Sequence, residues 1–122
     1  MELNKFTQQR TVTAEMTAEK AGSGYLPVFS TPSLIALMEN TAMQLVPLSE
    51  GESSVGVSIE VKHIKASTIG ETITCDAVLT SIDGRKYNFD LTAHDSYGDM
   101  VGEGKHQRVV IHVEKFMVKL GK

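Results

Sequence analysis

The sequence predicts an α+β fold in which one long helix is wrapped by a curved antiparallel sheet. Two observations predict it: a run with helical spacing of apolar residues over 31–46, and, from residue 55 onward, segments in which apolar and polar residues alternate. Short glycine-containing turns separate these segments and indicate antiparallel neighbours. A helix that is apolar on more than one side needs a surface that curves around it, and such a sheet supplies that surface.

The composition of the chain limits the classes of protein to which it can belong. Its 122 residues, of which 41% are hydrophobic, predict one folded domain over residues 1–122. The formal net charge of -3 provides no basic surface for a nucleic acid. The single cysteine, Cys75, fits a reducing compartment, and the polar N-terminus lacks the apolar core of a signal peptide. We therefore expect a cytoplasmic protein that binds no membrane, since no apolar run is long enough to span one.

The first half of the chain is predicted to hold a strand and the long helix. Residues 10–21 favour a strand through their threonines and valine, although their alanine, glutamate and lysine content would also suit a helix. After a loop with glycines and prolines, Thr31 is the expected N-cap and Pro32 the first helical residue. The helix is expected to be surrounded by protein and to end at Pro47, because its apolar residues cover more than one face.

Four strands are predicted after the helix. The first places Val55, Val57, Ile59 and Val61 on one face, together with His63. The second and third are joined by a hairpin turn at Asp83–Gly84 and carry two further alternating sets: Ile73, Cys75, Ala77 and Leu79, then Tyr87, Phe89, Leu91 and Ala93. The last runs from residue 101 to about 116, with Val109, Ile111 and Val113 on one face. With the helix, these strands describe a hot-dog fold, and the bare sheet edge that remains predicts a homodimer.

Glu39 is the first candidate functional residue. Its neighbours three and four residues away on the helix are all apolar: Ile35, Ala36, Ala42 and Met43. A buried carboxylate is costly unless it is paired, and functional sites are enriched in such groups. The alternative is a narrow wet stripe formed with Asn40 and Thr41, and helical spacing alone leaves both interpretations open.

Thr31 and His63 are candidates for acid–base or nucleophilic chemistry. A threonine before proline is commonly only a helix cap, but its hydroxyl also lies beside free backbone N–H groups that can stabilise an oxyanion. His63 is either a core histidine or a general base suited to neutral pH. Thr31 and Glu39 lie roughly 12 Å apart along a helix, so they would have to flank one substrate, or a partner subunit would have to close the gap. No group of residues has metal-ligand spacing, so we expect no metal.

The segment VGEGKHQRVV places Gly102, Gly104, His106 and Arg108 on one face of a strand. Glycines in a strand suggest a bulge, or the close approach of a ligand or of another backbone. Arg108 is either a ligand for phosphate or carboxylate, or an ordinary exposed arginine.

Three segments, PVFSTPSLIALMENTA, GVSIEVKHIKASTIGE and GEGKHQRVVI, resemble the fluoroacetyl-CoA thioesterase-like family of hot-dog proteins in their order and spacing. The resemblance runs from about residue 12 to residue 116. It implies a homodimer that hydrolyses an acyl-CoA thioester at the subunit interface, with coenzyme A as part of the substrate and no other cofactor. It further implies catalytic roles for three residues and substrate-binding roles for two others: Thr31, Glu39 and His63, and then Gly56 and Arg108.

The expected substrate carries a small or medium acyl group, and the loop over residues 22–29 is expected to cover it, with Tyr25 and Phe29 shaping the pocket. In the expected mechanism, Thr31 attacks the thioester or positions a water molecule near the helix N-terminus. Glu39 is the general base or a nucleophilic carboxylate, and His63 is the general acid or orients the others. The expected cations for the coenzyme A phosphates are Arg108, Lys105 and Lys62.

Two other functions belong to different classes. The first is a hot-dog domain that binds an acyl-CoA or another small hydrophobic ligand without hydrolysing it. The second is a hydratase or dehydratase, which is disfavoured because the characteristic aspartate-and-histidine loop motif of that class is absent from the sequence.

Overall fold

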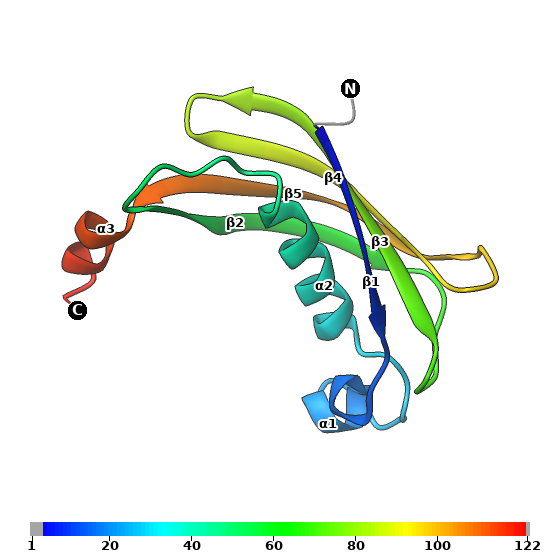
Figure 1. Cartoon of the computed structure of the whole chain (residues 1–122). Coiled ribbons are helices and arrows are strands. Elements are labelled where there is room, and N and C mark those ends of the chain that lie inside the picture. The colour runs from blue at the N-terminus through cyan, green and yellow to red at the C-terminus, as the bar shows by residue number, and fades with distance from the viewer. Residues whose placement is uncertain (1–3, 122) are drawn as a thin grey trace.

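One antiparallel sheet curves around a central helix in this computed structural model, which describes residues 4–121 (Figure 1). The sheet has five strands in the order β1-β3-β4-β5-β2, and every neighbouring pair is antiparallel. The elements are β1 (Lys5–Thr11), the 3-10 helix η2 (Ala14–Met16), α1 (Ala18–Ala21), α2 (Thr31–Met43), β2 (Glu52–His63), β3 (Thr72–Asp83), β4 (Lys86–His94), β5 (Met100–His112) and α3 (Val113–Lys119). The predicted wrapping of a helix by a sheet is confirmed.

The core lies between α2 and the concave face of the sheet. The helix contributes Leu34, Leu37, Met38 and Ala42, and strands β3 and β4 contribute alternate buried residues: Ile73, Cys75, Ala77, Phe89, Leu91 and Ala93. The alternation in these two strands was predicted from the sequence and is confirmed. The helix itself is covered on one side only, since Ala36 and Met43 are exposed, so the prediction that protein surrounds it is wrong for the chain alone.

The predicted strand over residues 10–21 is wrong for most of its length. Strand β1 lies earlier and ends at Thr11, and the rest of the segment forms η2 and α1. Thr17 caps α1 by accepting a hydrogen bond from the Lys20 N–H at 3.4 Å, and Gly22 ends it with a left-handed φ of 76°. Strand β1 has no apolar alternation, because it pairs with β3 at the sheet edge and none of its residues is fully buried.

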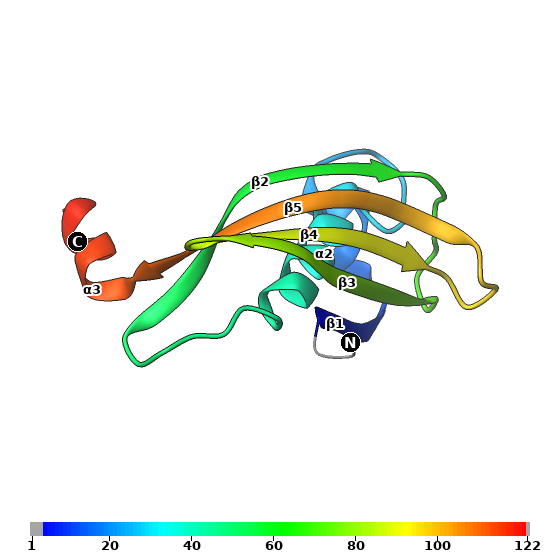
Figure 2. The same cartoon turned by 90° about the horizontal axis from the view of Figure 1, so that it is seen from above.

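Strand β2 is not next to β3, although the sequence order predicted neighbours. It pairs with β5 at the opposite edge of the sheet, and the connection over residues 64–71 crosses to β3 (Figure 2). This loop packs against the segment before α2, where the Phe29 N–H donates to the Ser67 carbonyl at 2.8 Å and Val28 forms a bridge with Thr68. The crossover therefore brings the end of β2 close to the start of α2.

A β-bulge at Val57 changes which residues of β2 face the helix. Gly56 pairs with Arg108 and Ser58 with Gln107, so Val57 has no partner and its side chain is 52% exposed. The prediction that Val57 shares a face with the next apolar residues is therefore wrong. Beyond the bulge, Ile59 and Val61 pack against the core, as predicted.

The inward face of β5 also differs from the prediction. It carries His106, Arg108 and Val110, all buried, and the strand ends at His112, where α3 begins. The sequence predicted Val109, Ile111 and Val113 on one face; Val113 lies in α3. The polar residues face inward because they form hydrogen bonds with each other and with β2.

The two glycines of β5 allow close packing within the protein. A Cβ at Gly104 would lie 2.3 Å from the Glu60 carbonyl oxygen, and one at Gly102 would lie 2.8 Å from a methyl group of Leu34. The predicted close approach is confirmed, and it is made by β2 and α2. Among the helices of residues 4–121, none is long and apolar enough to cross a membrane.

Candidate active site

Helix α2 begins one residue earlier than the sequence suggested, and this frees the Thr31 side chain. The N-cap is Ser30, whose hydroxyl accepts the Ser33 N–H at 3.1 Å. Thr31 is consequently the first helical residue and Pro32 the second, so the prediction that Thr31 is the N-cap is wrong. The Thr31 hydroxyl is therefore available for another partner.

That partner is His63, the last residue of β2. The Thr31 Oγ1 and His63 Nδ1 atoms lie 2.9 Å apart, and the edge-to-face ring of Phe29 packs on the imidazole at 6.2 Å between centroids. Burial lowers the pKa of His63, and a contact with the Lys65 backbone acts in the opposite direction. The imidazole is therefore neutral near pH 7 and can accept the Thr31 proton, which is the arrangement of an activated hydroxyl nucleophile.

The first turn of α2 also has one N–H group to spare. Ser33 N–H donates to the Ser30 hydroxyl, Leu34 N–H donates to the Ser30 carbonyl at 3.0 Å, and Pro32 has no N–H. Among the described residues, nothing accepts from the Thr31 N–H. This donor lies beside the Thr31 hydroxyl and can stabilise an oxyanion.

A cavity of about 250 Å³ opens beside the Thr31–His63 pair. Its other lining residues are mostly small or apolar: Ala18, Ser23, Val28, Phe29, Ser30, Lys65 and Ala66. Phe29 is buried and forms part of the wall. Tyr25 is 96% exposed and does not line the cavity in the single chain. The cavity is smaller than the roughly 300–1,000 Å³ typical of drug-sized ligands, so it suits a small group.

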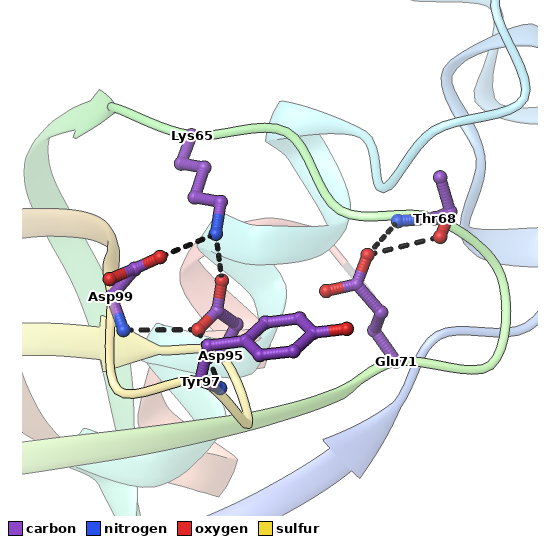
Figure 3. Close-up of polar contacts among 6 residues, drawn as sticks. All are labelled: Lys65, Thr68, Glu71, Asp95, Tyr97 and Asp99. Atoms are coloured by element: carbon purple, nitrogen blue, oxygen red, sulfur yellow. Dashed lines mark hydrogen bonds and ion pairs between the residues drawn. The ribbon is translucent and has the colours of Figure 1, made fainter.

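Lys65 fixes the main chain just after His63. Its ammonium group lies 2.6 Å from Asp95 and 2.7 Å from Asp99, and 5.4 Å from the centroid of the Tyr97 ring (Figure 3). The Asp95 carboxylate also accepts the backbone N–H groups of Tyr97 and Asp99, and the lysine holds its pKa below the usual range. This cluster ties the loop after β2 to the turn between β4 and β5.

The far end of the same loop is closed by Glu71. Its carboxylate accepts the Thr68 backbone N–H at 2.7 Å and the Thr68 hydroxyl at 3.0 Å (Figure 3). Thr68 in turn bridges to Val28 in the segment before α2. The loop that follows His63 is thus fixed at both ends.

Glu39 lies two turns further along α2, in a second polar cluster. A Cβ at Gly56 would lie 3.0 Å from the Glu39 Oε2 atom, 3.0 Å from the His106 ring and 3.5 Å from the Arg108 Nη1 atom. Glycine at position 56 therefore leaves a space that the Glu39 carboxylate, the His106 ring and the Arg108 guanidinium all border. The half-buried Glu39 lies near His106 and Arg108. Its neighbours Asn40 and Thr41 bond instead to Gln8 on β1.

Arg108 is buried, contrary to the interpretation of an exposed surface cation. Its Nε donates to the Ser54 hydroxyl at 2.8 Å, Nη2 donates to the Ser54 carbonyl at 3.0 Å, and Nη1 donates to His106 at 3.1 Å. His106 was not identified as a functional candidate from the sequence, although it was placed on the same strand face as Arg108. Lys105, another expected phosphate ligand, pairs with Asp90 at 2.9 Å.

The sequence-predicted residues therefore fall into two groups. The structure brings Thr31 and His63 together at one end of α2, with Phe29 beside them. It brings Glu39 together with Gly56 and Arg108 further along the helix. Helical rise separates Thr31 from Glu39 by about 12 Å, so one chain does not place the three expected catalytic residues around one point.

The stabilities of two variants, Ser30→Ala and Thr31→Ala, test the geometry at the start of α2 directly. We expect Ser30→Ala to lower the free energy of unfolding by about 1 kcal/mol, because the Ser33 N–H loses its acceptor. Thr31→Ala should change it by no more than about 0.5 kcal/mol. Urea unfolding of both variants and of the matched surface control Ser23→Ala measures these differences. A larger loss in Thr31→Ala than in Ser30→Ala would contradict the observed cap.

Comparison with known proteins gives a consistent picture. The sequence model of the family described as "Fluoroacetyl-CoA-specific thioesterase" matches residues 12–114. The fluoroacetyl-CoA thioesterase of Streptantibioticus cattleyicolor is 40% identical over 95 residues, which are 76% of this chain and 68% of that protein. A crystal structure of fluoroacetyl-CoA thioesterase superposes with a TM-score of 0.89 at 35% identity, covering 95% of this chain and 91% of the other.

More distant structures share the fold. A thioesterase superfamily member from Thermus thermophilus has a TM-score of 0.86 at 24% identity, covering 95% of this chain and 87% of its own. A hot-dog-like protein from Thermanaerovibrio acidaminovorans has the same TM-score and coverage at 22% identity. The predicted hot-dog fold is confirmed.

Proposed function

The chain belongs to the fluoroacetyl-CoA-specific thioesterase family, as its sequence predicted, and we propose that it hydrolyses an acyl-CoA thioester to the free acid and coenzyme A. The observation that carries the proposal is the 2.9 Å contact between the Thr31 hydroxyl and the neutral His63 ring at the wall of a cavity. A hydroxyl, a base and a free N–H donor are the groups that acyl transfer from a thioester requires.

The proposed first step forms an ester on Thr31. Its Oγ1 attacks the thioester carbon while His63 Nδ1 takes the hydroxyl proton, and the Thr31 N–H donates to the developing oxyanion. The carbon–sulfur bond then breaks, and the imidazolium returns the proton to the leaving thiolate of coenzyme A. In the second step water attacks the ester and Glu39 takes a proton from the water. That proton passes through His63 to the Thr31 oxygen as this oxygen leaves, which restores the Glu39 carboxylate and neutral His63.

The acyl group is proposed to be small. The cavity of about 250 Å³ beside Thr31 is lined by Ala18, Val28 and Phe29, and its volume suits a small acyl group. Tyr25 remains a proposed substrate-binding residue, because it is exposed on the loop before α2 and is free to cover the entrance when substrate or a second subunit is present.

We propose that the enzyme is a homodimer in which each site uses residues of both subunits. Strand β2 is twelve residues long and lies at the sheet edge, so it offers a row of backbone groups to a second copy. Pairing of two β2 strands about a two-fold axis would also cover Val57. In this dimer, the Glu39 side chain of one copy would lie close to the Thr31–His63 pair of the other. We place the reaction in the cytoplasm, where Cys75 stays reduced.

Release of free thiol from a panel of acyl-CoAs tests the proposed function. The panel runs from short to long chains and includes an aryl group, and we expect the highest kcat/KM for the shortest acyl groups. Saturable binding of acyl-CoA without thiol release from any member of the panel would contradict hydrolysis and support a binding module. A preference for long chains would contradict the proposed small pocket.

A further inference from the structure

We propose that His106 is a positioning residue for this hydrolysis: its neutral ring holds the Arg108 guanidinium beside the Glu39 carboxylate. The inference rests on the proposed function, since it assigns a role in the chemistry of Glu39. It is carried by a chain of hydrogen bonds that runs from β2 through His106 to Arg108. His106 is 3% exposed and Arg108 is 8% exposed.

The hydrogen bonds fix the tautomer of His106. A guanidinium has no acceptor, so the 3.1 Å contact between Arg108 Nη1 and His106 Nε2 requires that Nε2 be unprotonated. The proton then lies on Nδ1, which donates to the Ser58 carbonyl at 2.7 Å. Ser58 directly follows the bulge residue Val57, so the ring links the irregular part of β2 to the buried arginine.

Arg108 is held by three of its five N–H groups. Two contact Ser54 and one contacts His106, which leaves two for Glu39 or for substrate. The Arg108 Nη1 atom and the Glu39 Oε2 atom both border the space at Gly56. Without the acceptor on His106, the guanidinium would be fixed from the Ser54 side only and would be free to turn about that attachment.

The surroundings of His106 favour its neutral form. Phe89 on β4 packs against the ring at 6.2 Å, and the charged groups that face it are Arg108 on β5 and Glu39 on α2. Burial lowers the pKa of His106 below the ordinary value of 6.5, and Arg108 acts in the same direction. The Ser58 carbonyl and Glu39 act in the opposite direction.

Protonation of His106 would place a new N–H against the Arg108 N–H and break the contact. The unfolded chain binds this proton near pH 6.5, whereas the folded chain binds it only at lower pH. Stability from the neutral ring is therefore complete above that pH and falls as the solution becomes more acidic. The Arg108–Glu39 geometry should be lost in the same acidic range.

NMR of the wild-type protein tests the geometry without reference to activity. We expect the ¹⁵N shifts of His106 to report the Nδ1–H tautomer at pH 7, and a slowly exchanging Arg108 Nη1–H signal that disappears as His106 is protonated. An Nε2–H tautomer, or an Arg108 signal that does not respond to His106, would overturn the inference. This result stands whether or not the chain hydrolyses any acyl-CoA.

Kinetics of two variants test the consequence for the reaction. We expect His106→Leu to lower kcat/KM by about 10-fold to 100-fold, mainly through kcat, because Arg108 is no longer held in position beside Glu39. His106→Gln, whose amide oxygen can still accept from Arg108, should recover most of the loss and should lack the acidic titration of the wild type. His112→Leu is the control, since that histidine is exposed on the same strand.

Two results would overturn the positioning role while leaving the proposed hydrolysis standing. One is wild-type kcat/KM and an unchanged pH profile in folded His106→Leu. The other is equal loss in the leucine and glutamine variants, which would indicate packing alone. Absence of hydrolysis in the wild type would instead contradict the proposed function, and the NMR titration would then decide the placement of Arg108.

Discussion

Replacing Glu39 by glutamine lowers kcat for thioester hydrolysis by about 100-fold to 10,000-fold in our account, the range expected when a positioned general base is removed. Glutamine has nearly the same shape, so it fits the space that Gly56 leaves beside His106 and Arg108. The amide cannot accept a proton from water. The loss should therefore appear in kcat while the fold and the oligomeric state stay unchanged.

Free-thiol release, circular dichroism and size-exclusion chromatography measure these quantities on the same samples. The matched control is Glu60→Gln, which changes an exposed carboxylate at the outer surface of β2. A Glu39→Gln enzyme that keeps the wild-type rate but unfolds more easily would identify Glu39 as a structural partner of Arg108, and would remove it from the mechanism.

Removing the Thr31 hydroxyl is the second change with a large expected effect. Thr31→Ala should lower kcat/KM by about 100-fold or more, because the carbonyl carbon loses its nucleophile and His63 loses the proton it accepts. Thr31→Ser keeps a hydroxyl at the same place and should stay within about tenfold of the wild type. Neither change should unfold the protein, because Ser30 supplies the helix cap.

Single-turnover mass spectrometry separates the covalent route from direct attack by water. We expect an acyl ester on residue 31 in the wild type and in Thr31→Ser. We expect no acyl ester in Thr31→Ala. If Thr31→Ala hydrolysed the thioester at the wild-type rate, the hydroxyl would only line the cavity. If Thr31→Ala is slow and no acyl ester is trapped in any of the three proteins, the result would support direct attack by a water molecule that Thr31 positions.

The fold was predictable where burial is one-sided and the strand is regular. In β3 and β4 every second residue, such as Cys75 and Leu91, faces α2, so the pattern of apolar residues shows the register directly. Strand β1 has no such pattern, since it lies at the sheet edge and buries none of its residues fully. At Val57 a bulge shifts the alternation by one residue, and periodicity cannot place such an insertion.

The candidate residues could be named from the sequence, but their arrangement could not. The cap is Ser30 and not Thr31. Serine and threonine hydroxyls can both cap a helix, so the sequence alone could not decide between these two adjacent residues. His106 was missed because an inward polar residue on β5 is recognisable only once its partners Arg108 and Ser58 are placed. The division of the candidate residues into two groups depends on the strand order. The sequence predicted that β2 and β3 are neighbours, but they lie apart in the sheet.

The central claim is that Thr31 and His63 of one copy work with Glu39 of the other. Mixing two inactive variants, Glu39→Gln and Thr31→Ala, tests it most directly. In a mixed dimer, one site combines the intact Thr31–His63 pair of the first variant with the intact Glu39 of the second, and the other site carries both changes. Random reassociation makes about half of the dimers mixed, each with one intact site.

We predict that the mixture, after unfolding and refolding together, recovers about a quarter of wild-type thiol release, while each variant alone remains inactive after the same treatment. Mixed dimers are counted with a mass tag on one variant. If mixed dimers form and the mixture stays inactive, Glu39 does not act across the interface, and the proposed shared site is contradicted.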